Sequence, residues 1–417
     1  MSYAEQLQAA LVEPDRLVLR HIAATAAQLK YPLYLVGGSV RDCLLGYPIN
    51  EFDLTVEGDA IALARSIASE LNGALTSHDR FGTAKIRLPD RASVIKSIDV
   101  ATTRTETYAR PGALPEVTPG TIETDLIRRD FTINAMALRL DGDHFGELVD
   151  LYDGLHDLNN QLIRVLHARS FIDDPTRILR GARFEQHFDF AVEADTLNLI
   201  PDALPVIDQI SGDRLRHEIE LIWREARPDK PLARLQGWGV LWEIDRDLIF
   251  DDGTRASFQT HTAPFDRFTC WAWLLARRAP DVLKRISARF NLPRDEAIDL
   301  EQVNELWGRQ KTIGQAGTPS LIDRQLRPYH ERALRAALTL IADEAARRNI
   351  ERFLDELRAV RISLDGRQLQ VLGLPPGPAI GRVLLALREA RLDGIITTLQ
   401  QEEAYARQLI AREVKGE

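Results

Sequence analysis

The chain has 417 residues, which is too long for one ordinary hydrophobic core, so we expect two or more domains. Its 45% hydrophobic and 28% charged residues are typical of a globular protein. The net charge of −9 excludes a chain that is basic throughout, but it does not exclude a local basic face for RNA. No apolar run reaches the roughly 20 residues of a membrane span, and the N-terminus has no signal-peptide pattern. The only cysteines, Cys43 and Cys270, indicate a reducing compartment, so we expect a cytoplasmic protein.

The first predicted elements are helical. Residues 4–29 carry apolar residues at helical spacing, and Pro14 divides the stretch into two helices. The apolar run 33–36 then predicts a buried strand.

A glycine turn follows this strand. Gly37 and Gly38 allow the backbone to approach a ligand closely. A short helix is expected from Val40 to Leu45, and its free N–H groups, together with Arg41, suit a triphosphate. Asp42 completes this first cluster.

A pair of carboxylates comes next in the chain. Glu51 and Asp53 enter a predicted strand, 52–57, and their spacing of two places both on one face, roughly 7 Å apart. A phosphate cradle beside paired carboxylates is the geometry of two-metal phosphoryl transfer. Either cluster alone is better explained as an ordinary turn or a solvated strand end, but the joint pattern favours the site.

In the rest of the chain, the predicted secondary structure changes from mixed strands and helices to helices alone. Asp59–Leu71 has a helical pattern, and further strands are expected over 84–88, 94–101 and 134–140. From about residue 160 the strand signals fade, and long helical patterns broken by prolines replace them. We therefore predict a mixed α/β head, a boundary near 145–165 and an all-helical remainder.

Asp99 lies among apolar neighbours in the strand 94–101. A carboxylate in a buried strand is costly unless it is paired or binds a metal. Taken alone, this residue is best explained by a salt bridge to Arg41 or Arg104.

Two later segments are rich in arginine. Residues 125–135 read DLIRRDFTINA. A purely structural interpretation of this segment is a charged helix N-terminus that Asp130 caps. In residues 173–184, DDPTRILRGARF, Arg177, Arg180 and Arg183 share one face of a predicted helix that Asp174 caps. Taken alone, that helix favours a surface salt bridge of little energetic weight.

Together these segments resemble the tRNA nucleotidyltransferase and bacterial poly(A) polymerase family, the class II CCA-adding branch of the polymerase-β-like nucleotidyltransferases. That family has G-G-x-V-R-D at the glycine turn, D-x-D at the carboxylate pair, D-L-x-R-R-D-F-T-I-N-A and E-D-x-x-R. Here Glu51 replaces the first Asp of D-x-D, and Asp173 replaces the Glu of E-D-x-x-R. The resemblance is strong over about 31–220 and patchy to about 410.

The resemblance implies roles for these residues. Mg²⁺ would be held by Glu51, Asp53 and Asp99, since oxygen ligands beside a triphosphate favour it; Asp99 would alternatively activate the RNA 3′-hydroxyl. The expected nucleotide-binding residues are Gly37, Gly38, Arg41, Asp42, Arg128, Arg129, Asp130, Asn134, Asp174, Arg177, Arg180 and Arg183.

Within this set the resemblance assigns phosphates to Arg128 and Arg129 and a ribose hydroxyl to Asp130 and Asn134. Asp174 and Arg177 would pair with the Watson–Crick edge of the incoming base. An acceptor beside a forked donor reads C and A but fits G and U poorly.

The resemblance also predicts a loop at 107–122 that changes nucleotide choice, with an ordinary surface connection as the alternative. The expected fold is α+β: a nucleotidyltransferase head (1–145), then a helical neck (146–225) that recognises the base, then a helical body and tail (226–417) that bind tRNA.

The expected activity is template-independent addition of C and A to tRNA 3′ ends from CTP and ATP. A CC-only or A-only specialist and a poly(A) polymerase remain open. A non-catalytic RNA-binding paralogue is the alternative that Glu51 motivates. We expect no membrane association and infer no protein partner.

Overall fold

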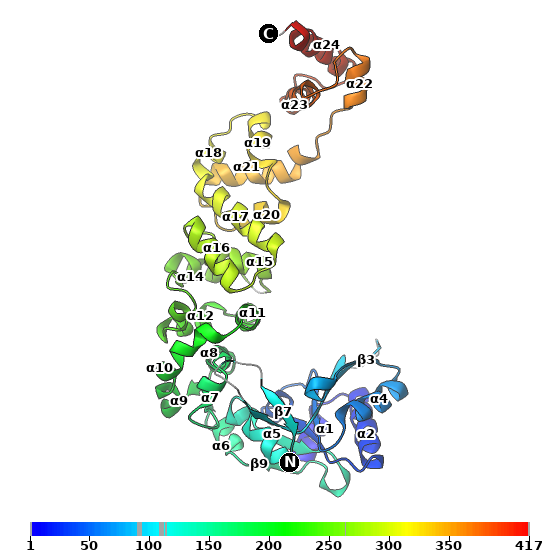
Figure 1. Cartoon of the computed structure of the whole chain (residues 1–417), viewed down its shortest axis with the longest axis vertical. Coiled ribbons are helices and arrows are strands. Elements are labelled where there is room, and N and C mark those ends of the chain that lie inside the picture. The colour runs from blue at the N-terminus through cyan, green and yellow to red at the C-terminus, as the bar shows by residue number, and fades with distance from the viewer. Residues whose placement is uncertain (1, 90–93, 108–111, 113–114, 263, 416–417) are drawn as a thin grey trace. The chain divides into compact units, whose positions relative to one another are not determined.

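The computed structural model describes residues 2–89, 94–107, 112, 115–262 and 264–415 (Figure 1). They form two compact units, Met1–Arg246 and Asp247–Glu417. The predicted division into head, neck, and body and tail stays a prediction. Among the described residues, no helix is long and apolar enough to cross a membrane.

The first unit contains a mixed sheet, which confirms the predicted fold class. Its strands are β1 (Leu33–Val36), β2 (Phe52–Val56), β3 (Ala74–His78), β4 (Thr83–Arg87), β5 (Ser97–Thr102), β8 (Met136–Arg139) and β9 (Leu148–Asp150). They lie in the order β3-β4-β5-β2-β1-β8-β9, with β2 and β5 parallel and the other neighbours antiparallel. Each predicted strand is present, although β5 begins only at Ser97. The sequence did not predict β3 or β9.

The helices of the first unit surround and follow this sheet. They are α1 (Tyr3–Ala9), α2 (Glu13–Gln28), α3 (Gly38–Leu44), α4 (Ala60–Leu71), α5 (Ile122–Ile127), α6 (Gly154–Asn159), α7 (Ser170–Asp173), α8 (Thr176–Phe188), α9 (Ala194–Asn198), α10 (Ile200–Ala203), α11 (Gly212–Ile222), α12 (Asp229–Gly237) and α13 (Val240–Ile244). The N-terminal break falls before Pro14, which occupies the first turn of α2 because its missing N–H has no partner to lose there.

Four short strands form two further pairs in the first unit. Strands β6 (Arg104–Thr107) and β7 (Glu116–Pro119) pair as an antiparallel hairpin. The predicted loop at 107–122 is therefore partly strand, and its residues 108–111, 113 and 114 lie outside the described residues. Strands β10 (Leu162–Ile163) and β11 (Ala191–Val192) form a separate two-stranded pair.

Antiparallel pairing positions the glycine turn. Leu35 of β1 lies opposite Leu54 of β2, so the C-terminal end of β1 lies beside the N-terminal end of β2. The turn after β1 therefore lies beside the strand start that carries Asp53. Tyr34 and Val36 pack against α5, and α4 packs against β3, β4 and β5.

The second unit is helical throughout its described residues. Its helices are α14 (Asp252–Thr260), α15 (Arg267–Leu275), α16 (Pro280–Arg289), α17 (Arg294–Gly308), α18 (Gln310–Gly314), α19 (Pro319–Leu326), α20 (Glu331–Leu338), α21 (Glu344–Asp355), α22 (Gly366–Val371), α23 (Ala379–Leu392) and α24 (Leu399–Lys415). Trp271 and Trp273, which stand between basic residues in the sequence, are both buried in its core.

Candidate active site

A pocket of about 800 Å³ in the first unit brings most of the predicted site residues together. It lies where the glycine turn, β2 and β5 face the end of α5 and the start of α8. Its lining includes Gly37, Gly38, Arg41, Asp53, Asp99, Arg128, Arg129, Asp130, Asn134, Asp174, Arg177, Arg180 and Arg183. Glu51 and Asp42 are not part of this lining.

The carboxylates of the pocket come from neighbouring strands. Asp53 of β2 lies directly beside Asp99 of β5 in the parallel register. Lys85 of β4 is the next residue across the sheet, and its Nζ donates to Asp99 Oδ2 at 2.7 Å. The salt bridge expected from Asp99 to Arg41 or Arg104 was therefore wrong, because β4 places a lysine closer. Glu51 is exposed, immediately before β2.

Asp53 carries negative charge that is poorly compensated. Burial and then the Glu51 and Asp99 charges raise the pKa of its carboxyl, and Arg129 and Lys85 lower it, with a net pKa of about 6. A divalent cation would relieve this repulsion, and carboxylate oxygens are the ligands that Mg²⁺ prefers. The donor set of Asp53 and Asp99 therefore fits such a cation. No cluster of three His, Cys, Asp or Glu side chains placed to hold a metal occurs among the described residues.

The glycine turn has a conformation that requires glycine. Gly37 has φ 67° and ψ −133°, which side-chain-bearing residues rarely adopt. A Cβ at this position would lie 2.8 Å from Arg129 Nη1. Ser39 Oγ donates to Glu51 O at 3.0 Å, which ties the turn to the start of β2.

Arg41 is held by the protein on several sides. Its Nε and Nη2 donate to Asp42 Oδ1 at 2.9 and 2.7 Å, and its Nη1 donates to Asn134 Oδ1 at 2.7 Å. Its guanidinium also lies 4.4 Å from the ring centre of Phe188, a cation–π distance. Arg41 is thus a fixed positive charge in the pocket wall.

Asn134 extends this network to Asp130. Its Nδ2 donates to Asp130 Oδ1 at 3.0 Å, while Asp130 Oδ2 forms an ion pair with Arg180 at 2.7 Å. Burial would raise the pKa of the Asp130 carboxyl, but Arg180 and these hydrogen bonds hold it below its usual range. Asp130 also accepts from the N–H of Phe131, so it organises the turn ahead of the short 3₁₀ helix Thr132–Asn134.

Arg177 and Asp174 do not pair with each other. Arg177 is 4% exposed and donates to Ser170 Oγ at 2.5 Å and to Arg128 O at 2.6 Å. Asp174 Oδ1 accepts from the N–H of Thr176 at 3.1 Å and from Arg214 Nη2 at 2.6 Å. The surface salt bridge that we expected as the alternative is therefore wrong: both residues are fixed by other partners, and both line the pocket.

Comparison with known proteins agrees with this geometry. The Poly A polymerase head domain family matches residues 33–164. A-adding tRNA nucleotidyltransferases from Geobacter sulfurreducens and Halalkalibacterium halodurans are 34% and 33% identical over 95% and 94% of this chain, and the chain covers 47% and 92% of them. A CC-adding tRNA nucleotidyltransferase from Deinococcus radiodurans is 31% identical, with 99% of this chain and 98% of the relative covered.

The chain belongs to the tRNA nucleotidyltransferase family. It spans about half of the Geobacter relative and nearly all of the Halalkalibacterium and Deinococcus relatives. A solved structure of a CCA-adding enzyme superposes with a TM-score of 0.79 at 27% identity, covering 100% of this chain and 99% of that one. The predicted family and fold are thus confirmed, whereas the roles of the individual site residues stay predictions.

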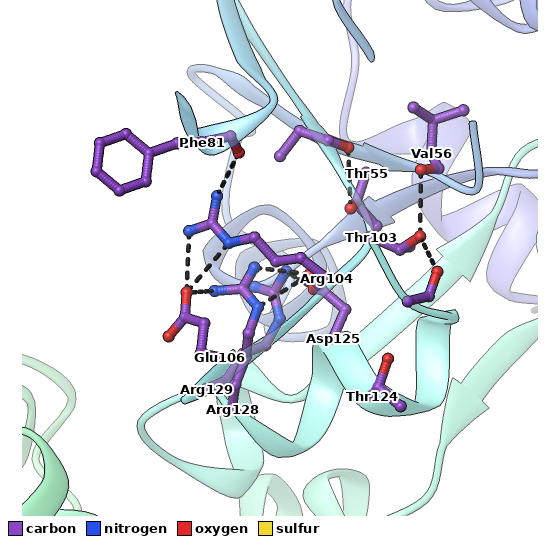
Figure 2. Close-up of polar contacts among 12 residues, drawn as sticks. Thr55, Val56, Phe81, Thr103, Arg104, Glu106, Thr124, Asp125, Arg128 and Arg129 are labelled. Atoms are coloured by element: carbon purple, nitrogen blue, oxygen red, sulfur yellow. Dashed lines mark hydrogen bonds and ion pairs between the residues drawn. The ribbon is translucent and has the colours of Figure 1, made fainter. Parts of the chain in front are cut away.

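The structure adds residues to this nucleotidyltransferase pocket that the sequence analysis missed. Lys85, Glu106 and Arg214 contact predicted site residues, and Asp125 was quoted only as part of a motif. Figure 2 shows Glu106 and Asp125 among three arginines at the end of α5. The spacing of Asp125 from Arg128 and Arg129, at i,i+3 and i,i+4, was the one signal in the sequence, and the structure shows Asp125 completely buried.

Proposed function

We propose that the chain transfers nucleotides from ATP and CTP to the 3′ end of tRNA without a nucleic-acid template. The observation that carries the proposal is the pocket itself, in which Asp53 and Asp99 stand on one wall and a set of arginines on the other. Carboxylates suit a metal-bound triphosphate, and arginines suit its phosphates. The relatives' names support tRNA as the acceptor.

The metal role goes to Asp53 and Asp99, with Glu51 as an additional ligand from the start of β2. Mg²⁺ bound there would supply Lewis-acid stabilisation of the charge that develops on the phosphoryl oxygens. Lys85 holds the Asp99 carboxylate at one oxygen, and Ser39 holds the backbone of Glu51. These contacts fix the ligands before a nucleotide arrives.

The arginine wall binds and orients the nucleotide. Arg41 and Arg180 present charges fixed by Asp42, Asn134 and Asp130, so little side-chain freedom is lost when phosphates bind. Asp130 and Asn134 stand in the lining as the proposed contacts to the ribose.

Asp174 and Arg177 are proposed to read the base. Within the described residues, the hydrogen bonds that Asp174 accepts all go to Oδ1, so its Oδ2 faces no competing donor. Arg177 uses Nη1 and Nη2 for Ser170 and Arg128, which fixes the orientation of its guanidinium. A fixed acceptor and a fixed donor discriminate between bases because a mismatched base leaves one of them unpaired.

The test uses purified full-length protein, Mg²⁺ and two tRNA substrates, one ending at the discriminator base and one ending in CC. Each is incubated with CTP alone, ATP alone and both. Addition of C only to the first tRNA, of A only to the second, or of CCA to the first distinguishes the three specialisations. Failure to extend either tRNA contradicts the proposal, and long A tracts on either would indicate poly(A) synthesis instead.

The variant Glu51→Asp tests the alternative hypothesis that the chain is a non-catalytic RNA-binding paralogue. Since Glu51 is one methylene longer than the Asp of the family motif, it displaces the carboxylate, and a displacement of about 1 Å can cost about a hundredfold in rate. An active parent excludes the paralogue. An inactive parent that gains activity as Glu51→Asp would support it.

A further inference from the structure

We propose that Glu106 is a positioning residue of the nucleotide pocket. It fixes Arg128, and Arg128 acts through Asp125 on Arg129, which is the arginine of the pair that binds the triphosphate. The inference rests on the proposed function, because it requires the pocket to bind nucleoside triphosphates.

The residues concerned form a compact charged cluster between β6 and the end of α5 (Figure 2). Its carboxylates are almost completely enclosed: the side chain of Glu106 is 6% exposed and that of Asp125 is 0% exposed. Buried charges are tolerated only when partners surround them. Their partners therefore determine where the arginines of the cluster stand.

Every nitrogen of the Arg128 guanidinium is engaged inside this cluster. Its Nη1 donates to Glu106 Oε1 at 2.8 Å, and its Nε and Nη2 donate to Asp125 Oδ1 at 3.0 and 2.6 Å. Each nitrogen of its guanidinium thus already serves a carboxylate. Arg128 connects the two carboxylates and is the less suitable of the pair for phosphate binding.

Arg129 is used differently. Its Nη2 donates to Asp125 Oδ2 at 2.9 Å, whereas its buried Nε has no hydrogen-bond partner within the described residues. Its Nη1 lies over Gly37, and its charge lowers the pKa of Asp53. Arg129 therefore stands between the glycine turn and the carboxylates, where a triphosphate would lie, with donor capacity to spare.

Asp125 couples the two arginines through its two oxygens. Oδ1 accepts from Arg128 and Oδ2 accepts from Arg129, so a rotation of the carboxylate moves both. Burial would raise the pKa of Asp125, but Arg129 and Arg128 hold it below its usual range, so the carboxylate stays charged. If the contact between Arg128 and Glu106 is lost, Arg128 can move, Asp125 can move with Arg128, and Arg129 is then displaced from Gly37.

Glu106 is itself anchored to the strand that carries Asp53. Arg104 donates to Glu106 Oε1 from Nε at 3.1 Å and to Phe81 O from Nη1 at 3.1 Å. At the base of the hairpin, Thr103 Oγ1 donates to Gly120 O at 2.6 Å, and the N–H of Thr103 donates to Val56 O at 3.0 Å. The cluster thus fixes Arg129 relative to β2.

The experiment compares the binding of ATP with that of AMP by full-length protein in Mg²⁺, because only the triphosphate needs Arg129. Glu106→Gln keeps the shape of the side chain and removes its charge. We expect the ratio of ATP to AMP affinity to fall about tenfold, because a neutral amide oxygen holds Arg128 less strongly than a carboxylate does. Glu116→Gln, an exposed residue of the paired strand β7, is the matched control and should leave the ratio unchanged.

A double-mutant cycle decides whether Glu106 acts through Arg129. Arg129→Ala should lower the ratio by a similar factor, and adding Glu106→Gln to it should change the ratio by less than about twofold. An unchanged ratio in Glu106→Gln, or an undiminished effect in the Arg129→Ala background, overturns the inference.

A second variant keeps the inference testable if Glu106→Gln does not fold. Arg128→Lys keeps the positive charge but cannot reach Glu106 and Asp125 together, so it should lower the ratio in the same way. If Glu106→Gln fails to fold in a thermal unfolding assay, this variant decides, and an unchanged ratio in it overturns the inference. A parent that binds no ATP at all contradicts the proposed function instead.

Discussion

The pocket has a strand wall, formed by β2 and β5, and a helix wall, formed by α5 and α8. Both walls bury carboxylates, but the pKa values of these carboxylates shift in opposite directions. Asp53 on the strand wall has its pKa raised to about 6, mainly by burial and then by its acidic neighbours. Asp125 and Asp130 on the helix wall are buried at least as deeply, yet arginines hold their pKa values below the usual range. Partners rather than depth therefore decide the direction in which each pKa shifts.

This difference separates two kinds of site. The helix wall already contains the cations that its carboxylates need, so its geometry is complete without a ligand. Within the described part of the chain, the cation of the strand wall is Lys85, which pairs with Asp99 and leaves Asp53 with surplus negative charge. It is therefore the wall that would gain most from a cation supplied from outside.

Asp53→Asn tests the strand wall and has the largest expected effect. The change is nearly isosteric, so the fold should persist while nucleotide transfer falls by at least about a thousandfold, because metal charge stabilisation contributes several kcal/mol. Initial rates of nucleotide incorporation into tRNA measure this. Asp143→Asn, at an exposed position of the same unit, should keep the parent rate. Near-parent turnover of Asp53→Asn would show that Asp53 has been misassigned.

Arg177→Ala tests the helix wall and should alter nucleotide choice. Loss of a charged donor worth about 1.5–3 kcal/mol should reduce discrimination against G and U roughly ten- to a hundredfold. Incorporation of all four ribonucleotides by parent and variant measures it. Arg169→Ala removes a largely exposed arginine that pairs with Asp173 and should leave discrimination intact. A parent-like preference in Arg177→Ala rules out base reading by Arg177.

The smallest expected effect is on the pH dependence of the free energy of unfolding, measured without divalent metal. Folded Asp53 keeps its proton up to pH about 6, whereas the unfolded chain releases it near 3.8. Between these values the folded state binds more protons, so the free energy of unfolding should fall as pH rises from about 4 to about 6 and stay lower above that range.

Asp53→Asn removes this penalty. With partial exposure of the site taken into account, the variant should be more stable than the parent by about 1–2 kcal/mol at pH 8 and nearly equal to it at pH 4. Urea unfolding in a chelator at both pH values measures this. A variant less stable than the parent at pH 8 would contradict the charge surplus on the strand wall.

The sequence predicted the elements of the pocket well because their signals are local. Strand β1, the glycine turn and the start of β2 follow from neighbouring residues. Strand β3 was missed because its five residues are mostly exposed and show no clear alternation.

The partners of the polar residues could not be predicted in the same way. Asp99 pairs with a lysine 14 positions away and Asp174 with an arginine 40 positions away, on other elements. The salt bridges that the sequence favoured for Asp99 and for the α8 helix compete with such contacts, and tertiary packing decides between them. Glu106 pairs with Arg104 two positions away, but its link to the pocket passes through Arg128, 22 positions away, and no local pattern indicates that contact.

The parallel pairing of β2 with β5 has a consequence for how this enzyme family can vary. Asp53 faces Asp99 because of strand register, and the length of the chain that joins the two strands does not enter. Insertions in that connection, around α4, β3 or the start of β4, would leave the two carboxylates adjacent. One residue inserted inside β2 after Asp53 would shift the register by one position and turn the two side chains to opposite faces. Natural or engineered length changes should therefore be confined to the connection and absent from the two short strands.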